Sequence, residues 1–288
     1  YFAGDYGLKP KFWRIRFILR NIINNLVKSE KFSYKASQFS VKYNNLSVKY
    51  KNMPSPSRWY CLKYLEMNLP YITNMLDIGC GEGDYYKYVT QIIGKDITYK
   101  GLDFFESSYW KNIQKPTIQF EQFDLINQNP FDIYKEYEFV FSQSVLEHIP
   151  NDISIFRDSI NNLINSSKAK VVMHFIPAST TLITYPFHGY RQYNINSIRK
   201  MLLDIDTTNL DIRIHSLGGF ADYILHLILI TVPESIFGRF RFSFRENYSD
   251  LYMSLLKYSI NFNYFIRGLK VNQLFASFYV IEVRKKSV

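Results

Sequence analysis

The stretch MLDIGCGEGD, from Met75 to Asp84, carries the strongest fold signal in this chain of 288 residues. An apolar run leads into Gly79, Gly81 and Gly83, and the sequence then predicts a helix that begins near Asp84. Glycine is needed where the backbone turns sharply and where a ligand approaches with no room for a Cβ atom. In open α/β sheets, a loop between a strand and a helix lies outside the strand carboxyl ends, where nucleotides bind.

Short β-rich runs alternate with helical stretches after this loop, which is typical of successive βαβ units. The sequence therefore predicts an α/β fold with a seven-stranded, mostly parallel sheet and helices on both faces. The predicted strands are Asn74–Gly79, Ile97–Asp103, Ile118–Asp124, Glu138–Ser144 and Ala169–Ile176, with Leu210–Ser216 and Ala276–Arg284 added at one edge.

The chain divides into four parts on this basis. Residues 1–54 form a basic N-terminal helical extension and residues 55–219 the α/β core. Residues 220–273 form an apolar, helical insertion, and residues 274–288 complete the core with its last strand. We expect the insertion either to cap an acceptor pocket or to form a homodimer surface.

The first helix of the core is predicted to start at Pro56, with Ser55 as its N-cap, because proline is favoured at the first helical position and serine before it. Apolar residues then follow at steps of three and four, which predicts one buried face. That face consists of Trp59, Leu62, Leu65 and Leu69.

The net charge of +10 belongs to the extension. Residues 1–50 hold ten Lys or Arg and two acidic residues, whereas the rest of the chain holds 25 basic and 23 acidic residues. Nucleic-acid binding would call for a basic surface on the body, so no nucleic-acid partner is expected. Only Cys61 and Cys80 are present, which excludes a disulfide framework and favours a reducing, cytoplasmic setting.

A basic amphipathic helix is predicted in the extension, from about Lys11 to Lys28. It either contacts an anionic lipid surface at the inner face of the membrane, or folds over the active site as a lid that buries its apolar stripe. We slightly favour the lid. The stripe consists of Phe12, Ile15, Leu19, Ile22 and Leu26, and the basic residues Lys11, Arg14, Arg16 and Arg20 lie mainly off it.

The acids around the glycine loop indicate which kind of nucleotide binds. Asp77, Glu82 and Asp84 would repel a pyrophosphate, whereas they would attract a ligand that carries an ammonium and a sulfonium. The third glycine also comes one residue early for the dinucleotide fingerprint. Asp103, at the end of the next strand, is placed to accept hydrogen bonds from both ribose hydroxyls.

Four segments together resemble the class I S-adenosylmethionine (SAM)-dependent methyltransferases. LDIGCGEGDY resembles motif I of that family, and Asp103 in YKGLDFF falls at its ribose-binding acid. Asp124 in FEQFDL resembles the contact to the adenine amine, and FSQSVLEHIP, Phe141 to Pro150, resembles the loop that faces the methionine moiety. The resemblance covers about residues 55 to 180. It implies a Rossmann-like fold with SAM as cofactor.

The resemblance also implies the residues that bind SAM. Asp77 and the backbone of the glycine loop would hold the methionine end, Asp103 the ribose, and Asp124 the adenine. The complete set is Asp77, Gly79, Cys80, Gly81, Gly83, Asp103, Phe104, Asp124, Leu125, Ser142 and Gln143.

The acceptor side rests on histidines, because an imidazole titrates near neutral pH and can remove a proton from a hydroxyl. His148 follows the fourth strand, and His188 lies in TYPFHGYRQYN, Thr184 to Asn194, after the fifth strand. Both are candidate catalytic bases. His174 lies inside a hydrophobic strand and is interpreted as a core residue. No metal site is predicted.

The TYPFHGYRQYN segment also resembles a stretch found in methyltransferases of bacterial surface-polysaccharide gene clusters. That resemblance implies O-methylation of a saccharide or glycan-linked small molecule. The Asn-Pro-Pro-Tyr type of motif is replaced by Ser142-Gln143-Ser144-Val145, which argues against an adenine or glutamine acceptor. Two alternatives remain: a lipid or quinone-like acceptor, and a SAM-fold subunit that binds without catalysing a reaction.

Overall fold

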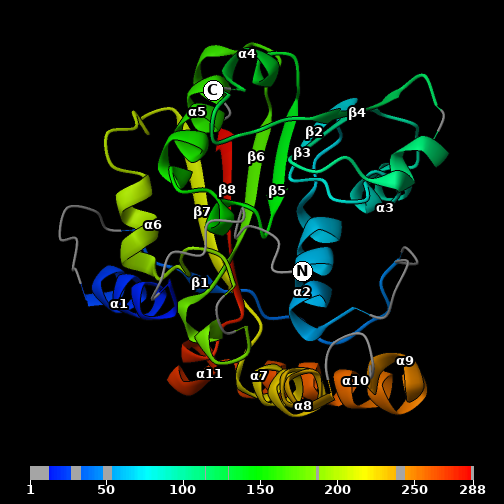
Figure 1. The fold of residues 1–288 in the computed structure, drawn as a ribbon, viewed down its shortest axis with the longest axis vertical. Coiled ribbons are helices and arrows are strands. Elements are labelled where there is room, and N and C mark those ends of the chain that lie inside the picture. Colours follow the sequence, from blue (N-terminus) through cyan, green and yellow to red (C-terminus); the bar gives the residue numbers. More distant parts are fainter. Residues whose placement is uncertain are drawn as a thin grey trace.

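The computed structural model describes residues 13–26, 34–47, 54–113, 115–128, 130–185, 188–237 and 244–286. It confirms the predicted α/β class, with a mostly parallel sheet at the centre (Figure 1). The strand order is β1-β7-β8-β6-β5-β2-β3-β4, and β8 is antiparallel to both of its neighbours. The strands are β1 (Ser37–Gln38), β2 (Asn74–Ile78), β3 (Thr98–Asp103), β4 (Ile118–Gln122), β5 (Phe139–Gln143), β6 (Val171–Pro177), β7 (Leu210–Leu217) and β8 (Phe278–Lys285).

The sheet has eight strands rather than the predicted seven. The additional strand, β1, comes from the N-terminal extension and pairs in parallel with β7, with Ser37 opposite His215. Its two residues are too few to show an alternating pattern of apolar and polar side chains, so the sequence gives no signal for it. The extension is thus partly built into the sheet.

Helices cover both faces of the sheet, and each face has its own core. Met75 of β2 packs in the core on one side, and the next residue, Leu76, packs in the core on the other. This alternation follows from the two-residue period of a strand. The first face is covered by α2 (Pro56–Asn68) and α3 (Asp84–Ile93), and the second by α4 (Phe131–Tyr134), α5 (Asp152–Asn165) and α6 (Ile195–Met201).

Helix α2 begins as predicted, because the Ser55 hydroxyl accepts a hydrogen bond from the backbone N–H of Arg58 and Pro56 opens the helix. It is buried on more than the predicted face: Tyr60, Cys61 and Tyr64 are also inaccessible to solvent. The reason is that α2 lies between the sheet and the helical insertion, where both sides are covered.

The described residues of the insertion are mostly helical and lie beyond the carboxyl ends of the parallel strands (Figure 1). The buried carboxylate of Asp222 ties its helices together by accepting hydrogen bonds from Ser259 and Asn263. The elements are α7 (Phe220–His226), a π-helical turn (Leu227–Thr231), α8 (Val232–Phe237), α9 (Phe244–Asn247), α10 (Ser249–Phe265) and α11 (Lys270–Leu274).

Helix α1 (Trp13–Leu26) packs on α6 through Phe17 and Asn21. The Asn21 side chain accepts a hydrogen bond of 2.8 Å from the backbone N–H of Gln192. Two members of the predicted apolar stripe, Ile15 and Leu19, are 54% and 52% exposed. This exposure contradicts the lid interpretation, which buries the stripe against the body. Phe12 lies outside the described residues.

No helix in the described part of the chain is long and apolar enough to cross a membrane. Helix α1 keeps apolar side chains in solvent all the same. They are Ile15, Ile18, Leu19, Ile22 and Ile23.

Candidate cofactor and acceptor site

The glycine loop leaves β2 with three left-handed residues: Gly79, Gly81 and Gly83 have φ angles of 70°, 56° and 81°. A Cβ atom on Gly79 would lie 2.2 Å from a methyl group of Val145, so this glycine permits the loop after β5 to pack directly on the glycine loop. A Cβ atom on Gly81 would meet no described atom within 4 Å. The glycine loop is therefore covered by the loop after β5 at Gly79, whereas no described residue covers it at Gly81.

The backbone N–H groups of this loop are used inside the protein. A phosphate-binding loop needs such groups pointing at the ligand. In this loop they bond within the protein, which disfavours a phosphate ligand, and the carbonyl oxygens of Cys80 and Gly81 also accept hydrogen bonds, from the Gly83 N–H and the Trp110 indole N–H. The N–H groups of Gly79 and Cys80 donate to Leu102 O at 2.7 and 3.0 Å, that of Gly81 donates to the Asp103 carboxylate at 2.8 Å, and that of Gly83 donates to Cys80 O at 2.9 Å.

Asp103 and Asp124 follow the ends of β3 and β4, and both are half-buried. Among the described residues, the two Asp103 oxygens accept from the N–H groups of Gly81 and Phe105. The two Asp124 oxygens accept from the Ile126 N–H and the Asn127 side chain. A carboxylate has about four acceptor positions, so both groups keep capacity for a ligand. Phe104 and Leu125 lie beside them, also half-buried. Their contacts to a cofactor stay predictions.

Asp77, Cys80 and Ser142 have side chains inside the protein. Asp77 accepts a hydrogen bond of 2.7 Å from the Tyr99 hydroxyl, and burial raises its pKa to about 7. The Cys80 side chain packs on Gly101, and burial raises the pKa of its thiol. Ser142 bonds the ring of His174 at 2.7 Å. These three side chains support the loops from within, and their contacts to a cofactor stay predictions.

Gln143 at the end of β5 is held by two helices. Its side-chain carbonyl accepts a hydrogen bond from the Tyr85 hydroxyl of α3. Arg58 of α2 donates to the same hydroxyl at 3.3 Å. Tyr85 and Arg58 were absent from the sequence-based candidates, because their aromatic and basic side chains show no pattern that separates them from ordinary helix residues.

The two candidate bases, His148 and His188, lie together although 40 residues separate them. Their Nε2 atoms are 3.2 Å apart. The Glu147 carboxylate lies 3.5 Å from the Nε2 atom of His188 and 3.8 Å from that of His148. The Ser144 hydroxyl lies 3.2 Å from the same atom of His188 and also donates to Glu147. The fold thus assembles a Glu147–His148–His188 cluster that no sequence spacing indicates.

Burial controls the charge of this cluster. It lowers the pKa of His148 to about 4, so that this imidazole is neutral at pH 7. Burial alone would raise the pKa of Glu147, but the hydrogen bond from His188, the nearby charges of the two histidines when protonated and the hydrogen bond from Ser144 together bring this pKa below its ordinary value. The cluster therefore combines a carboxylate with a neutral imidazole.

The segment after β6 is shaped to bring His188 to Glu147. Gly189 has a φ angle of 69°, and a Cβ atom there would lie 2.7 Å from the Glu147 carbonyl oxygen. The backbone N–H of Tyr190 donates to that oxygen at 2.6 Å. Glu147 was not among the candidates, although an acid in the otherwise apolar run VLEHIP was a usable signal.

Arg191 and Tyr193 anchor the same segment to α5. Arg191 forms an ion pair with the buried Asp152, and the Tyr193 hydroxyl donates to the second oxygen of Asp152 at 2.7 Å. Both side chains are therefore engaged within the protein and are not presented to an acceptor. His174 is a core residue, as predicted, and bonds Ser142 and Ser159.

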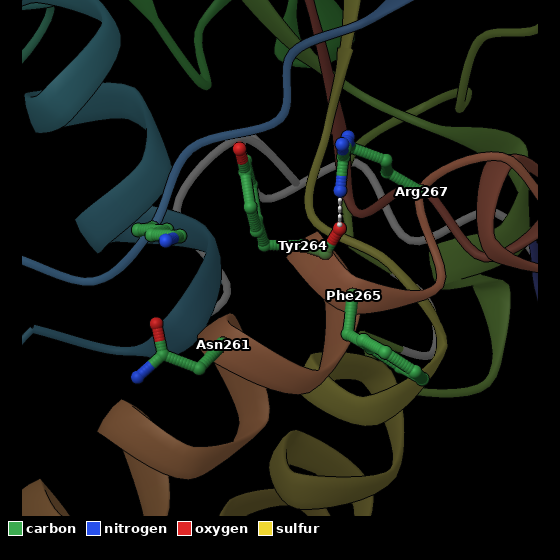
Figure 2. A pocket seen from close by; sticks show the side chains of 5 residues that line it. Asn261, Tyr264, Phe265 and Arg267 are labelled. Carbon is green, nitrogen blue, oxygen red and sulfur yellow. Dashed lines mark hydrogen bonds between the residues drawn. The ribbon is translucent and has the colours of Figure 1, made fainter.

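An open pocket of about 520 Å³ lies elsewhere, at the end of α10 (Figure 2). Arg267 donates a hydrogen bond of 2.8 Å to the Tyr264 carbonyl oxygen at its rim. Its lining residues are Lys42, Asn261, Tyr264, Phe265 and Arg267, none of which belongs to the glycine loop or to the cluster.

Residues 76–166 match the family model described as a methyltransferase domain. The matched range contains the glycine loop, Asp103, Asp124 and two members of the cluster, Glu147 and His148. The chain carries a class I SAM-dependent methyltransferase domain. SAM is therefore its cofactor, and the glycine loop lies within the matched residues.

Solved structures of methyltransferases resemble the chain at low identity. The plantazolicin methyltransferase BpumL in complex with SAH is 15% identical, with coverage of 81% of this chain and 83% of that chain and a TM-score of 0.46. The phosphoethanolamine N-methyltransferase 2 of Haemonchus contortus, with S-adenosyl-L-methionine, is 17% identical, with coverage of 82% and 55% and a TM-score of 0.49.

A SAM-dependent methyltransferase from Mesorhizobium loti is 12% identical, with coverage of 80% of this chain and 98% of that chain and a TM-score of 0.46. No curated protein matches the chain.

Proposed function

We propose that this methyltransferase methylates a hydroxyl oxygen of a saccharide or glycan-linked small molecule. The observation that carries the proposal is the position of the Glu147–His148–His188 cluster directly beside the cofactor loop. Val145, which lies in the same turn as Glu147, is the residue that contacts Gly79. Groups able to handle an acceptor proton therefore lie next to the predicted methionine end of the cofactor.

The residues of the site fit SAM. The surface at Gly81 is open to a ligand, and Asp103 keeps acceptor positions for ribose hydroxyls. When bound, SAM would supply an electrophilic methyl group on a sulfonium, and its sulfur would keep the electron pair of the broken methyl–sulfur bond.

The cluster favours a hydroxyl acceptor because a hydroxyl must lose its proton, whereas an uncharged amine already carries an available lone pair. His188 is the more accessible of the two histidines: its side chain is 34% exposed, against 11% for His148. Glu147 lies beside His188 and stabilises the imidazolium that forms when His188 accepts the proton. His188 is accordingly the proposed base, with Glu147 as its positioning partner.

An aromatic wall supports a sugar acceptor. The ring centroids of Tyr185 and His188 are 6.0 Å apart, and the rings of Tyr185 and His226 are 4.5 Å apart. Tyr185 is held from the other side, since its hydroxyl bonds that of Ser57 at 3.1 Å. His226 is buried and supports Tyr185 from behind, so the rings of Tyr185 and His188 are the ones that we propose as stacking faces for a sugar.

The test is to incubate the chain with SAM and a panel of nucleotide sugars and glycans, and to locate the transferred methyl group by mass spectrometry. We expect an O-methyl product, with turnover lost in His188→Ala and retained in His215→Ala, a matched control at the far edge of the sheet. Methylation of an amine nitrogen, or full turnover in His188→Ala, would contradict the proposal.

Helix α1 supports a second proposal, peripheral contact with the cytoplasmic face of an anionic membrane. Its apolar residues Ile15, Ile18, Leu19, Ile22 and Ile23 lie in solvent. The first 50 residues of the chain also carry the excess of positive charge. Apolar side chains that insert between lipids and basic residues that attract anionic headgroups are the two contributions to interfacial binding. Such contact would place the enzyme near lipid-linked acceptors.

A further inference from the structure

We propose that Glu147, His148 and His188 bind one divalent transition-metal cation, to which the acceptor hydroxyl coordinates. The cation-binding part stands on the geometry of the three side chains alone. The part that concerns the acceptor rests on the proposed O-methylation. The sequence predicted no metal site. It gave no signal for this one because its ligands come from two separate segments of the chain.

The separations of the three side chains match those of ligands around one cation. Imidazole nitrogens and carboxylate oxygens bind such cations at about 2.0–2.2 Å, which places neighbouring ligand atoms about 3 to 3.5 Å apart. The nitrogen–nitrogen distance of 3.2 Å between His148 and His188 and the oxygen–nitrogen distance of 3.5 Å between Glu147 and His188 fall in that interval. The remaining distance, 3.8 Å between Glu147 and His148, needs only a small rotation.

The cluster is also built as a site rather than as a chance surface contact. Glu147 is completely buried, and its second carboxylate oxygen has no hydrogen-bond partner among the described residues. A buried, unpaired carboxylate oxygen is costly. This oxygen, Oε2, gains a partner when both carboxylate oxygens bind the cation, because Oε1 is the oxygen that faces the two histidines. The position of each ligand is fixed from outside the cluster, by the strand end before Glu147 and by the Gly189 turn after His188.

The donor set indicates the kind of cation. Two imidazoles and one carboxylate suit Mn²⁺, Fe²⁺, Co²⁺ or Zn²⁺, whereas Mg²⁺ and Ca²⁺ prefer sites made of oxygen. Three protein ligands leave further coordination positions, and the Ser144 hydroxyl at 3.2 Å from His188 Nε2 lines the same space. An acceptor oxygen can therefore enter as a ligand.

The cation would change how the acceptor loses its proton. A coordinated hydroxyl has a strongly lowered pKa, so its proton passes to water and the oxygen keeps the lone pair that attacks the methyl carbon. With the cation bound, His188 acts as a ligand that positions the acceptor; the role of base proposed above applies to the chain without a cation. The two roles make opposite predictions for chelation: a metal-dependent enzyme loses turnover with a chelator, whereas an enzyme with His188 as base does not.

The experiment uses the full chain without a polyhistidine tag, stripped with chelator and titrated with Co²⁺ and Zn²⁺ by calorimetry. Visible absorption of the Co²⁺ form reports on the ligands independently of catalysis. We expect one cation per chain, with affinity reduced at least tenfold in Glu147→Gln and in His188→Ala and unchanged in the matched control His215→Ala. SAM binding by each variant checks that it is folded.

Absence of stoichiometric binding in wild-type chain that still binds SAM would overturn the proposal, and so would equal affinity in the variants. These outcomes are independent of the acceptor. Turnover that survives chelation but is lost in His188→Ala would overturn the cation while supporting O-methylation with His188 as base. Failure to methylate any hydroxyl, with cation binding intact, would contradict only the proposed acceptor.

Discussion

The Asp103 carboxylate accepts a hydrogen bond of 2.8 Å from the backbone N–H of Gly81. This contact joins the end of β3 to the loop that follows β2, so the predicted ribose-binding acid also holds the glycine loop in place. A second oxygen of Asp103 accepts from the Phe105 N–H at 3.1 Å, which fixes the carboxylate between the two turns. One side chain therefore holds the glycine loop in place and also brings a negative charge to the predicted cofactor site.

Replacement of Asp103 by Ala is expected to weaken the binding of SAM and of S-adenosylhomocysteine at least tenfold. Hydrogen bonds to a charged group contribute about 1.5–3 kcal/mol each, and the variant loses those to the ribose together with the one that orders the loop. Calorimetric titration measures the effect. The control is Glu106→Ala, which removes an exposed acid three residues away; affinity that falls equally in both variants would reduce the role of Asp103 to general charge.

Gly79→Ala tests the contact between the glycine loop and the cluster. The new methyl group would lie 2.2 Å from Val145 and would also adopt a left-handed conformation that costs about 1–2 kcal/mol. We expect SAM affinity to fall more than tenfold because the two loops must separate. Calorimetry and thermal unfolding measure the two consequences.

Gly94 provides the matched control for that variant. It has a similar φ angle of 73°, and a Cβ atom there would meet no described atom within 4 Å. Gly94→Ala should therefore lower stability by about 1–2 kcal/mol from backbone strain and leave SAM affinity unchanged. The double variant Gly79→Ala/Val145→Ala should recover part of the lost affinity. Equal SAM affinity for the Gly79 and Gly94 variants would show that the loop contact plays no part in binding.

The sequence predicted the sheet well because its strands are apolar runs with clear ends. Met75 to Ile78 and Phe139 to Phe141 are buried on both sides, and such runs carry their own signal. The sequence did not predict how α1 packs on the rest of the protein. Its period of apolar residues predicted a buried stripe, but the helix packs through Asn21, whose amide bonds the backbone of residue 192. A single tertiary hydrogen bond of this kind leaves no mark in a hydrophobic pattern.

The glycine loop and its acids could be predicted because they lie within one stretch and at fixed spacing. The cluster could not, because its geometry depends on the path of the chain between Ile149 and Tyr190. That path is set by the ion pair between Arg191 and Asp152 and by the left-handed turn at Gly189. Each is visible as a residue type in the sequence, but their pairing exists only after β6 and α5 have packed side by side.

Asp222 should make the stability of the insertion depend on pH. Burial raises its pKa from 3.8 to about 7, although Ser259 and Asn263 donate hydrogen bonds to it. A raised pKa in the folded state favours the protonated form, so the contribution of Asp222 to stability is full below pH 4 and is lost as the pH rises to 7. The linkage amounts to at most about 4 kcal/mol.

Asp222→Asn should remove this contribution to the pH dependence. As the pH rises from 4 to 7, the wild type should therefore lose unfolding free energy relative to the variant. Denaturant unfolding at several pH values measures that difference. Asp77, whose pKa burial also raises to about 7, contributes a slope of the same sign in both proteins and cancels in the comparison. A difference that stays constant with pH would mean that Asp222 is ionised throughout.

Helix α1 should bind anionic vesicles through the side chains that it leaves in solvent. Sedimentation with vesicles of phosphatidylglycerol and phosphatidylcholine measures the bound fraction. The double variant Ile18→Ser/Ile22→Ser should lower the apparent affinity for vesicles about tenfold or more. Full insertion of each isoleucine side chain into the lipid stabilises the bound state by about 1.5–3 kcal/mol. Both side chains are 47% exposed, so the substitutions should leave the fold intact.

The control for this variant is Ile236→Ser on α8, whose side chain is 67% exposed but lies on the insertion. It should bind vesicles as wild type does. Raising the salt concentration should weaken binding of the wild type, because the basic extension contributes through anionic headgroups and salt screens that attraction. Two outcomes would exclude α1 as the membrane contact: equal vesicle binding by the wild type, the α1 variant and the Ile236→Ser control, or binding to neutral vesicles that salt does not affect. The exposed apolar residues of α1 would then be assigned to contact with a protein partner.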